Sequence, residues 1–144
     1  MENKNVNELD VIALARELGK KIQQEDVFIK YMLAKQNADN DPDLQKSLKE
    51  FGDKREELSD ESGKPEDKKD PKRIQEISRE MNRCYAAIMT NQSMMNYSEA
   101  KDNYDVLMNR VNAIIQKSFE GEDPATADYV PNCTGSCATC GGCG

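Results

Sequence analysis

Apolar residues recur at every third or fourth position through most of the chain, the spacing that places them on one face of an α-helix. The first run comprises Val11, Leu14, Ala15, Leu18 and Ile22, and the pattern resumes at Phe28, Tyr31 and Met32 beyond a polar stretch. We therefore expect one long helix over about residues 8–36. A helix of that length cannot bury its apolar stripe by itself, so the stripe needs a packing partner.

Two later runs each begin at an Asp-Pro pair, Asp41-Pro42 and Asp70-Pro71. Asp is a favoured N-cap, and Pro suits the first helical position because its missing N–H would have no partner there. The second run has apolar residues at Leu44, Leu48, Phe51 and Leu58, and the third at Ile74, Ile77, Met81, Cys84 and Ile88. Residues 59–69 between them contain Gly and Pro but no apolar residue, which indicates a loop. The two runs predict an antiparallel helical hairpin.

A fourth helical run begins between Asn91 and Ser98, and Gly121 and Pro124 mark its end. Its apolar positions are Tyr97, Ala100, Tyr104, Leu107, Met108, Val111, Ile114 and Ile115. The pattern leaves open whether this helix follows the third one through a kink or after a sharp bend. We expect a helical domain over residues 1–121, a linker over 122–132 and a cysteine-rich tail over 133–144.

The fold class that follows is all-α, with long antiparallel helices forming a helical bundle or hairpin and a Cys-rich C-terminal tail. Charged residues make up 33% of the chain and Trp is absent, which is typical of long helices exposed to solvent. The apolar fraction of 37% is low for a monomer of 144 residues. We therefore expect a homo-oligomer in which another chain completes part of the core. The seven methionines are expected to fill gaps at helix contacts.

The composition excludes several classes of function. The chain contains no histidine, so no Ser-His-Asp or Cys-His arrangement and no imidazole acid or base is available. The net charge of -7 argues against direct nucleic-acid binding, which requires clustered Lys and Arg. No apolar run reaches the length needed to span a membrane. We expect a protein that is not an enzyme.

Candidate chemistry is concentrated in the last twelve residues, which contain Cys133, Cys137, Cys140 and Cys143 among several glycines. The spacing is C-x3-C-x2-C-x2-C, and its C-x2-C-x2-C part matches the run by which bacterial ferredoxins place thiolates around one iron-sulfur cluster. Two intervening residues let successive sulfurs point into one pocket, and glycine permits the tight curl. The four cysteines are therefore candidate ligands of an iron-sulfur cluster, with 4Fe-4S as the expected type.

Two other interpretations of these cysteines remain open. Four thiolates also suit tetrahedral zinc, although zinc sites usually separate two C-x2-C pairs by a longer loop. Disulfides or free thiols are the ordinary interpretation in a secreted protein. The chain begins MENKNVNELD without an apolar signal segment, and its one other cysteine, Cys84, lies on an apolar helix stripe. We expect a cytoplasmic protein, and in that reducing compartment the pattern favours a metal.

The helical part resembles a known family. The opening DVIALARELGKKIQQEDVFIKYMLAK, the spaced second helix and a late M-x-N-Y-x-x-A-x-x-N-x-x-x-L motif with Tyr97, Ala100 and Leu107 look like the YlbF/YmcA family. These are small helical proteins of Firmicutes, first noted in the control of competence. The resemblance covers about residues 8–119. Some YlbF-type members carry C-terminal cysteines, and the assembly of YlbF, YmcA and YaaT is associated with 4Fe-4S clusters.

The resemblance implies a cytosolic regulatory adaptor without enzymatic activity. Such an adaptor acts in a complex that modulates RNase Y and messenger RNA processing, and through it competence, sporulation and biofilm formation. Partners of the YmcA and YaaT type, and RNase Y itself, are implied in the same way. Two alternatives remain: a module that binds or transfers zinc or another metal on a helical oligomerisation scaffold, and a purely structural scaffold to which the cysteine tail is incidental.

Overall fold

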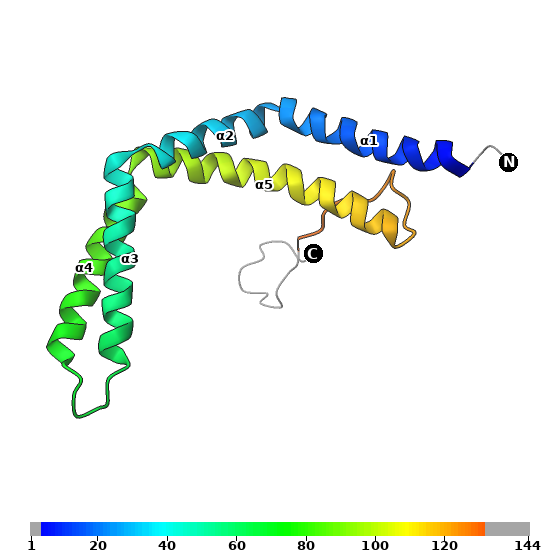
Figure 1. Ribbon diagram of the computed structural model, residues 1–144. Coiled ribbons are helices and arrows are strands. Elements are labelled where there is room, and N and C mark those ends of the chain that lie inside the picture. Colours follow the sequence, from blue (N-terminus) through cyan, green and yellow to red (C-terminus); the bar gives the residue numbers. More distant parts are fainter. Residues whose placement is uncertain (1–3, 132–144) are drawn as a thin grey trace, which may run out of the picture. The chain divides into compact units, whose positions relative to one another are not determined.

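The computed structural model describes residues 4–131 of the chain, and within that range it contains five helices and no strand (Figure 1). The helices are α1 (Lys4–Gln24), α2 (Asp26–Asp39), α3 (Pro42–Ser62), α4 (Pro71–Thr90) and α5 (Gln92–Phe119). The prediction of an all-α protein is confirmed. The chain falls into two compact units that divide within α5, between Tyr104 and Asp105.

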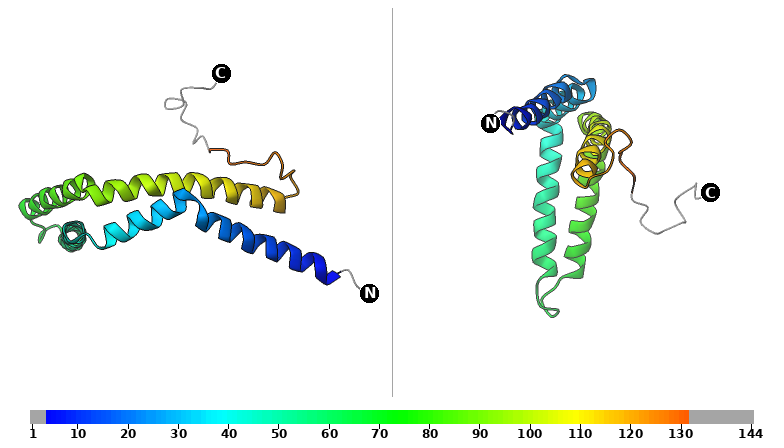
Figure 2. Two further views of the ribbon diagram at one scale, coloured as in Figure 1. Left: turned by 90° about the horizontal axis from the view of Figure 1, so that it is seen from above. Right: turned by 90° about the vertical axis from the view of Figure 1, so that its right-hand side faces the viewer.

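The prediction of one helix over residues 8–36 is wrong, because α1 and α2 are separate helices. The break lies at Glu25, whose backbone is extended with φ -70° and ψ 139°, and Figure 2 shows the resulting bend. Glu25 caps α2 through its backbone carbonyl, which accepts from the N–H groups of Phe28 and Ile29. The side chains from Gln23 to Asp26 are polar, so a bend in this segment exposes no apolar surface to water. Each apolar run keeps helical spacing on its own, but that spacing does not report whether the backbone between the two runs is continuous.

The helices α3 and α4 pack side by side as the predicted antiparallel hairpin (Figure 2). Both begin at the expected caps. Asp41 Oδ1 accepts from the N–H groups of Asp43 and Leu44, each at 3.0 Å. Asp70 Oδ1 accepts from Lys72 and Arg73 at 3.0 and 3.3 Å. Each cap satisfies helix N–H groups that have no partner within the helix, which is why the Asp-Pro pairs define these two starts so clearly.

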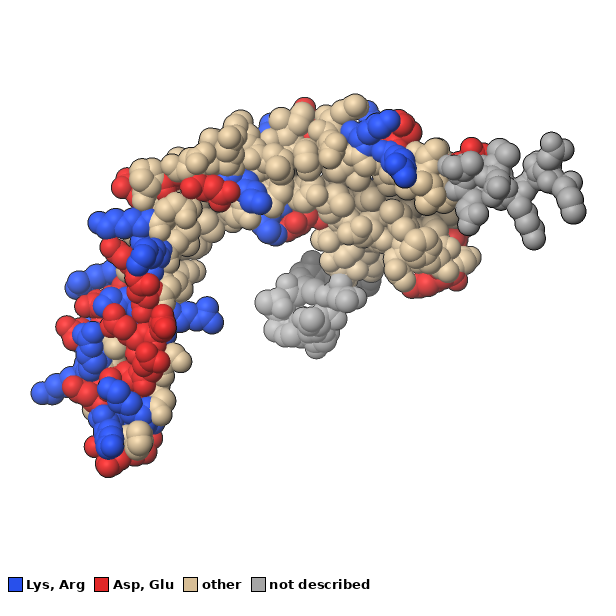
Figure 3. Space-filling view, viewed as in Figure 1, with Lys and Arg blue, Asp and Glu red and all other residues tan. Residues whose placement is uncertain are grey.

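Charged residues crowd the surface of this hairpin (Figure 3). Glu61 is buried near its tip and accepts from the N–H of Asp70 at 3.0 Å and from the ammonium of Lys64. The bond from Lys64 is the main reason that the pKa of Glu61 is lowered. Lys54 pairs with Glu80 across the hairpin at 2.7 Å. The hairpin contains few buried apolar residues, and its two fully buried large side chains are Leu44 near the start of α3 and Ile77 on α4.

The apolar core of the first unit lies where α2, α3, α4 and α5 meet. Leu44 is 1% exposed and forms a cluster with Ala38 and Ile88. The half-buried side chains of Phe51, Met94 and Tyr97 pack against this cluster. The core is therefore small and depends heavily on Leu44.

A polar network holds the same junction from outside. Asp41 Oδ2 accepts from Ser93 Oγ at 2.7 Å and from Asn91 Nδ2 at 3.2 Å. Hydrogen bonds from the N–H of Leu44 and from these two side chains lower the pKa of Asp41. Asn91 lies between α4 and α5, and its Oδ1 accepts from the N–H of Met94 at 3.0 Å, which caps α5. The third and fourth predicted helices are thus separated by a break at Asn91.

The second unit begins within α5, which ends at a Schellman motif. Gly121 has φ 86°, and its N–H donates to the carbonyl of Ser118 while the N–H of Glu122 donates to that of Lys117. Glycine suits this position because a side chain would oppose the left-handed backbone. The chain then reverses, and residues 122–131 run back beside the C-terminal part of α5 (Figure 1).

Candidate functional site

Aromatic rings join α2 to the N-terminal part of α5. The rings of Tyr31 and Tyr104 are stacked, with centroids 4.7 Å apart and planes inclined by 2°. Tyr97 lies 5.9 Å from Tyr31 on one side, and Phe28 lies 6.0 Å from Tyr104 on the other. Burial, and then a hydrogen bond with Tyr31, raise the pKa of Tyr97. This aromatic cluster fixes the spacing of the two helices.

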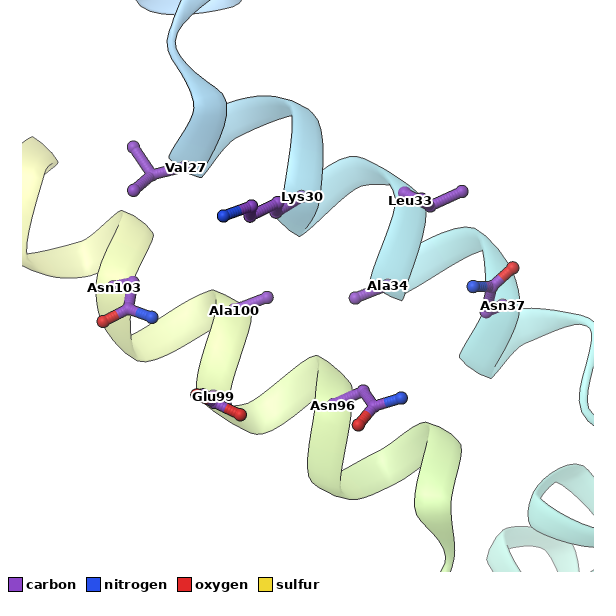
Figure 4. Close-up of a pocket in the computed structure, with 9 residues that line it drawn as sticks. All are labelled: Val27, Lys30, Leu33, Ala34, Asn37, Asn96, Glu99, Ala100 and Asn103. Atoms are coloured by element: carbon purple, nitrogen blue, oxygen red, sulfur yellow. The ribbon is translucent and has the colours of Figure 1, made fainter.

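A groove of about 370 Å³ lies along the same pair of helices (Figure 4). Ala34 of α2 and Ala100 of α5 face each other across it, and their short side chains leave the space open. Its lining residues are Val27, Lys30, Leu33, Ala34, Asn37, Asn96, Glu99, Ala100 and Asn103. Three amides, one ammonium and one carboxylate surround the apolar side chains, so the groove offers both hydrogen-bond donors and hydrogen-bond acceptors. Such a groove suits contact with a polypeptide.

A second recess of about 470 Å³ lies beside it and is lined by Met89, Met94 and Met95 with polar residues of α5. Met94 packs against the core, as expected from the sequence, but Met89 and Met95 are about half exposed. Flexible methionine side chains adapt to different partners. The prediction that the methionines fill gaps at helix contacts is therefore wrong for these two, and also for Met32, which is 45% exposed. Their exposure could not be recognised from the sequence, because buried methionines show the same helical spacing.

Residues 122–131, which we call the strap, are held against α5 by one bidentate ion pair. Arg110 Nε donates to Asp128 Oδ1 at 3.0 Å, and its NH2 group donates to Oδ2 at 2.8 Å. This pairing lowers the pKa of the Asp128 carboxyl group. Tyr129 lies over a shallow hollow on the helix beside Asn109, Ala113 and Gln116. Within the described part of the segment expected as a linker, Asp128 and Tyr129 thus lie against α5.

Replacing Arg110 with Asp is expected to release the strap, because the bidentate pair becomes a repulsion between two carboxylates. Backbone amides of residues 125–130 should exchange with deuterium about tenfold faster or more, while those of α3 and α4 keep their rates. Hydrogen exchange read by mass spectrometry measures both. The double variant Arg110→Asp with Asp128→Arg reverses the pair and should restore protection. Equal exchange in the wild type and the single variant would show that the pair does not hold the strap.

The four predicted ligands, Cys133, Cys137, Cys140 and Cys143, lie outside the described residues. Among the side chains that the structure describes, those of residues 10–131, no group of three or more Cys, His, Asp or Glu is placed to bind a metal ion. Cys84 is half-buried on α4, and its Sγ lies 4.0 Å from a carboxylate oxygen of Glu50. Its position on the apolar stripe of α4 agrees with the sequence prediction, and it lies among the contacts between the helices of the hairpin.

Fold and surface together define a small helical protein whose grooves and exposed helix faces suit contact with other proteins. Residues 11–120 match the family model described as Control of competence regulator ComK, YlbF/YmcA, and the chain belongs to this family. It is accordingly a regulatory protein of the competence-control type. No curated protein and no solved structure matches the chain. Among the described helices, none combines the length and apolarity needed to cross a membrane.

Proposed function

We propose that the protein is a cytoplasmic, self-associating adaptor without enzymatic activity, whose cysteine tail binds a 4Fe-4S cluster. In this proposal it acts in a complex with proteins of the YmcA and YaaT type and modulates messenger RNA processing by RNase Y. Competence, sporulation and biofilm formation are the processes that depend on it. It contacts neither nucleic acid nor membrane directly. The family match supports the adaptor role, and the groove between α2 and α5 and the recess lined by methionines of α4 and α5 offer surfaces for contact with another protein.

The donor set of the tail fits an iron-sulfur cluster. Cys133, Cys137, Cys140 and Cys143 supply four thiolates, the usual number for 4Fe-4S, and their C-x2-C-x2-C spacing is one that such clusters use. When bound, the cluster would supply a redox-sensitive and oxygen-sensitive group. The tail contains no side chain larger than Thr apart from the cysteines, so a metal is the main force available to order it.

The docked strap is the observation that carries the proposed coupling between cluster and adaptor. Asp128, which lies five residues before Cys133 in the sequence, is held beside α5 by Arg110. The sixteen residues from Tyr129 to Gly144 can extend at most about 55 Å from Asp128. A cluster in the tail would therefore lie close enough to the second unit to form part of a shared docking surface. Its loss would remove that surface.

Anaerobic purification of the untagged protein tests the cluster. We expect a brown protein with roughly equal iron and labile sulfide. The variant with serine at all four tail cysteines should contain neither, whereas the matched variant Cys84→Ser should retain both. A colourless protein with one zinc per chain would contradict the cluster and support the metal-binding or metal-transfer alternative. A metal-free protein would leave only the helical scaffold.

The adaptor role is tested in the cell. The four-cysteine variant should alter the processing of RNase Y substrates in the same direction as deletion of the gene, and Cys84→Ser should not. Co-purification with YmcA-type and YaaT-type proteins provides a second readout. Unchanged transcripts and unchanged partners in the four-cysteine variant would show that the tail has no part in regulation.

A further inference from the structure

The groove between α2 and α5 and the methionine-lined recess form one continuous surface. Glu99 and Asn103 line both hollows, so the two meet along α5. Every residue that lines either hollow lies between Val27 and Asn103, within the first unit. The way these residues are arranged therefore does not depend on where the second unit lies. We call the two hollows together the groove surface.

The shape of the groove surface suits the packing of a further helix. One face of α5 contributes Met95, Glu99 and Asp102, at helical steps of four and three residues. The neighbouring face contributes Ala100, which lies opposite Ala34 of α2 (Figure 4). Two such short side chains let another backbone come close to α2 and α5, and helices in contact have axes about 8–10 Å apart. A third helix can therefore lie along the groove.

Apolar side chains on the groove surface lack cover among the described residues. Leu33 of α2 is 56% exposed, Met95 of α5 is 50% exposed, and Met89 of α4 is exposed to a similar extent. Each of the three lines one of the two hollows. Methionine side chains are flexible and adapt to differently shaped apolar partners. An occupant of this surface therefore presents apolar side chains to it.

The two halves of the groove surface differ in charge. The lining of the groove contains one cation, Lys30, and one carboxylate, Glu99. The lining of the recess contains the carboxylates of Glu99 and Asp102 and no cation. Neither carboxylate forms an ion pair with another residue that the structure describes. Because like charges one turn apart on a helix repel each other, a cation supplied by an occupant is favoured on the recess side.

A helical protein segment fits this surface better than an extended peptide or a nucleic acid. An extended peptide binds by adding to a sheet edge, and the described residues contain no strand. A helix satisfies its own main chain and binds through side chains, and the amides of Asn37, Asn96 and Asn103 suit its polar flank. The phosphates of a nucleic acid would face Glu99 and Asp102.

We propose that the groove surface binds a basic amphipathic helix of a partner protein. The apolar residues of that helix lie against Leu33, Ala100 and Met95. Its Lys or Arg side chains lie on the recess side and pair with Glu99 and Asp102. This inference rests on the adaptor role proposed above and names the chemistry of the segment that the adaptor recognises.

Synthetic helical peptides test the chemistry of the occupant. Each probe is about 18 residues long, roughly 27 Å as a helix, with leucine along one face, lysine on one flank and alanine and glutamine elsewhere. Two versions carry the lysines on opposite flanks, so that either direction of the bound helix is served. We expect one of them to bind the full chain with a dissociation constant below about 100 μM. Isothermal titration calorimetry at roughly 150 mM salt, which screens distant charges, measures the constant.

Two control peptides separate the contributions of charge and of the apolar face. A twin with glutamate in place of lysine should bind about tenfold more weakly or not at all, because its carboxylates meet those of the recess. A peptide of the same composition with its leucines scattered around the helix should be weakened to a similar extent, because it has no apolar face to bury.

Charge exchange on the protein locates the binding surface. Glu99→Lys together with Asp102→Lys should weaken binding of the lysine peptide at least about tenfold and strengthen binding of its glutamate twin. The matched control combines Glu56→Lys with Asp60→Lys, at two exposed positions one turn apart on α3. It changes the net charge by the same amount and should leave both affinities nearly unchanged.

Filling the groove tests the proposed shape. Ala100→Leu places a larger side chain opposite Ala34 and should weaken binding of the lysine peptide about tenfold. Ala87→Leu makes the same change at an exposed position of α4 and should leave binding unchanged. Circular dichroism checks that each variant keeps its helix content. In NMR spectra of the wild type, the peptide should shift the backbone amide signals of residues 27–37 and 89–103 most strongly.

Three outcomes would overturn the proposal. They are a full chain that binds neither lysine peptide, for instance because its own second unit covers the surface, equal binding of the lysine and glutamate peptides, and equal losses in the double variants of α5 and α3. The titrations use the wild type and the four-cysteine variant. Peptide binding by a chain without a cluster would refute only the proposed cofactor. A chain that carries the cluster and alters RNase Y substrates, but ignores the peptides, would refute only this inference.

Discussion

Replacing Leu44 with alanine is expected to lower the free energy of unfolding of the first unit by about 3 kcal/mol. Leu44 is 1% exposed and lies at the centre of the cluster formed with Ala38 and Ile88. Truncation removes the buried apolar surface and leaves a cavity that Phe51 and Met94 can fill only in part. In a unit with so few fully buried residues, that loss is a large share of the total stability of about 5–15 kcal/mol typical of domains.

Leu48 provides the matched control for this prediction. It lies one turn further along α3, and the same change to alanine removes the same atoms, but the side chain is 40% exposed. We expect a loss below about 1 kcal/mol there. Urea unfolding followed by circular dichroism measures both variants. Equal losses for Leu44→Ala and Leu48→Ala would show that the junction is not the main source of stability.

The parts of the fold that follow local rules could be predicted from the sequence. The starts of α3 and α4 were recognisable because Asp at the N-cap and Pro at the next position act through hydrogen bonds within a few residues. The hairpin followed from two apolar stripes separated by a polar loop. The end of α5 at Gly121 was equally local, since only glycine readily takes the left-handed conformation found there.

Contacts between distant residues could not be predicted in this way. Asp41 was recognisable as a cap, but not as the acceptor for Asn91 and Ser93, which lie 50 and 52 residues away in the sequence. The pairing of Arg110 with Asp128 was hidden for the same reason, and residues 122–132 were expected only as a linker. The break at Glu25 was missed because helix periodicity reports which residues share a face and not whether the backbone is continuous.

The candidate functional surfaces also differ in whether the sequence could predict them. The cysteine tail was conspicuous because four thiols at short spacing have few other uses, and its role stays a prediction. The groove was not foreseen, since Asn37, Asn96 and Asn103 look like ordinary polar residues on separate helices until the packing of α2 on α5 brings them together. Small residues such as Ala34 and Ala100 carry no chemical signal, yet they leave the space that forms the groove.

Replacing Tyr31 with alanine is expected to detach α2 from the N-terminal part of α5 and to cost about 2–3 kcal/mol of unfolding free energy. Tyr31 is the central ring of the aromatic cluster, stacked on Tyr104 and close to Tyr97. Its removal takes away two ring contacts at once and widens the groove beside it. Circular dichroism of the tyrosines in the near ultraviolet and urea unfolding report the two effects.

Two control variants show whether the ring contacts of Tyr31 account for the expected loss of stability. Tyr31→Phe keeps both contacts and loses only the hydroxyl near Tyr97, so most of the stability should remain. Tyr85→Ala removes an exposed ring whose contact with Phe51 is looser, with centroids 6.4 Å apart, and should cost less than Tyr31→Ala. NMR titration should also show the raised pKa of Tyr97 falling toward its ordinary value in Tyr31→Ala, because both burial and the hydrogen bond that raise it are lost. An unchanged Tyr97 titration would mean that α2 stays in place without Tyr31 and that the groove is held by the neighbouring apolar contacts instead.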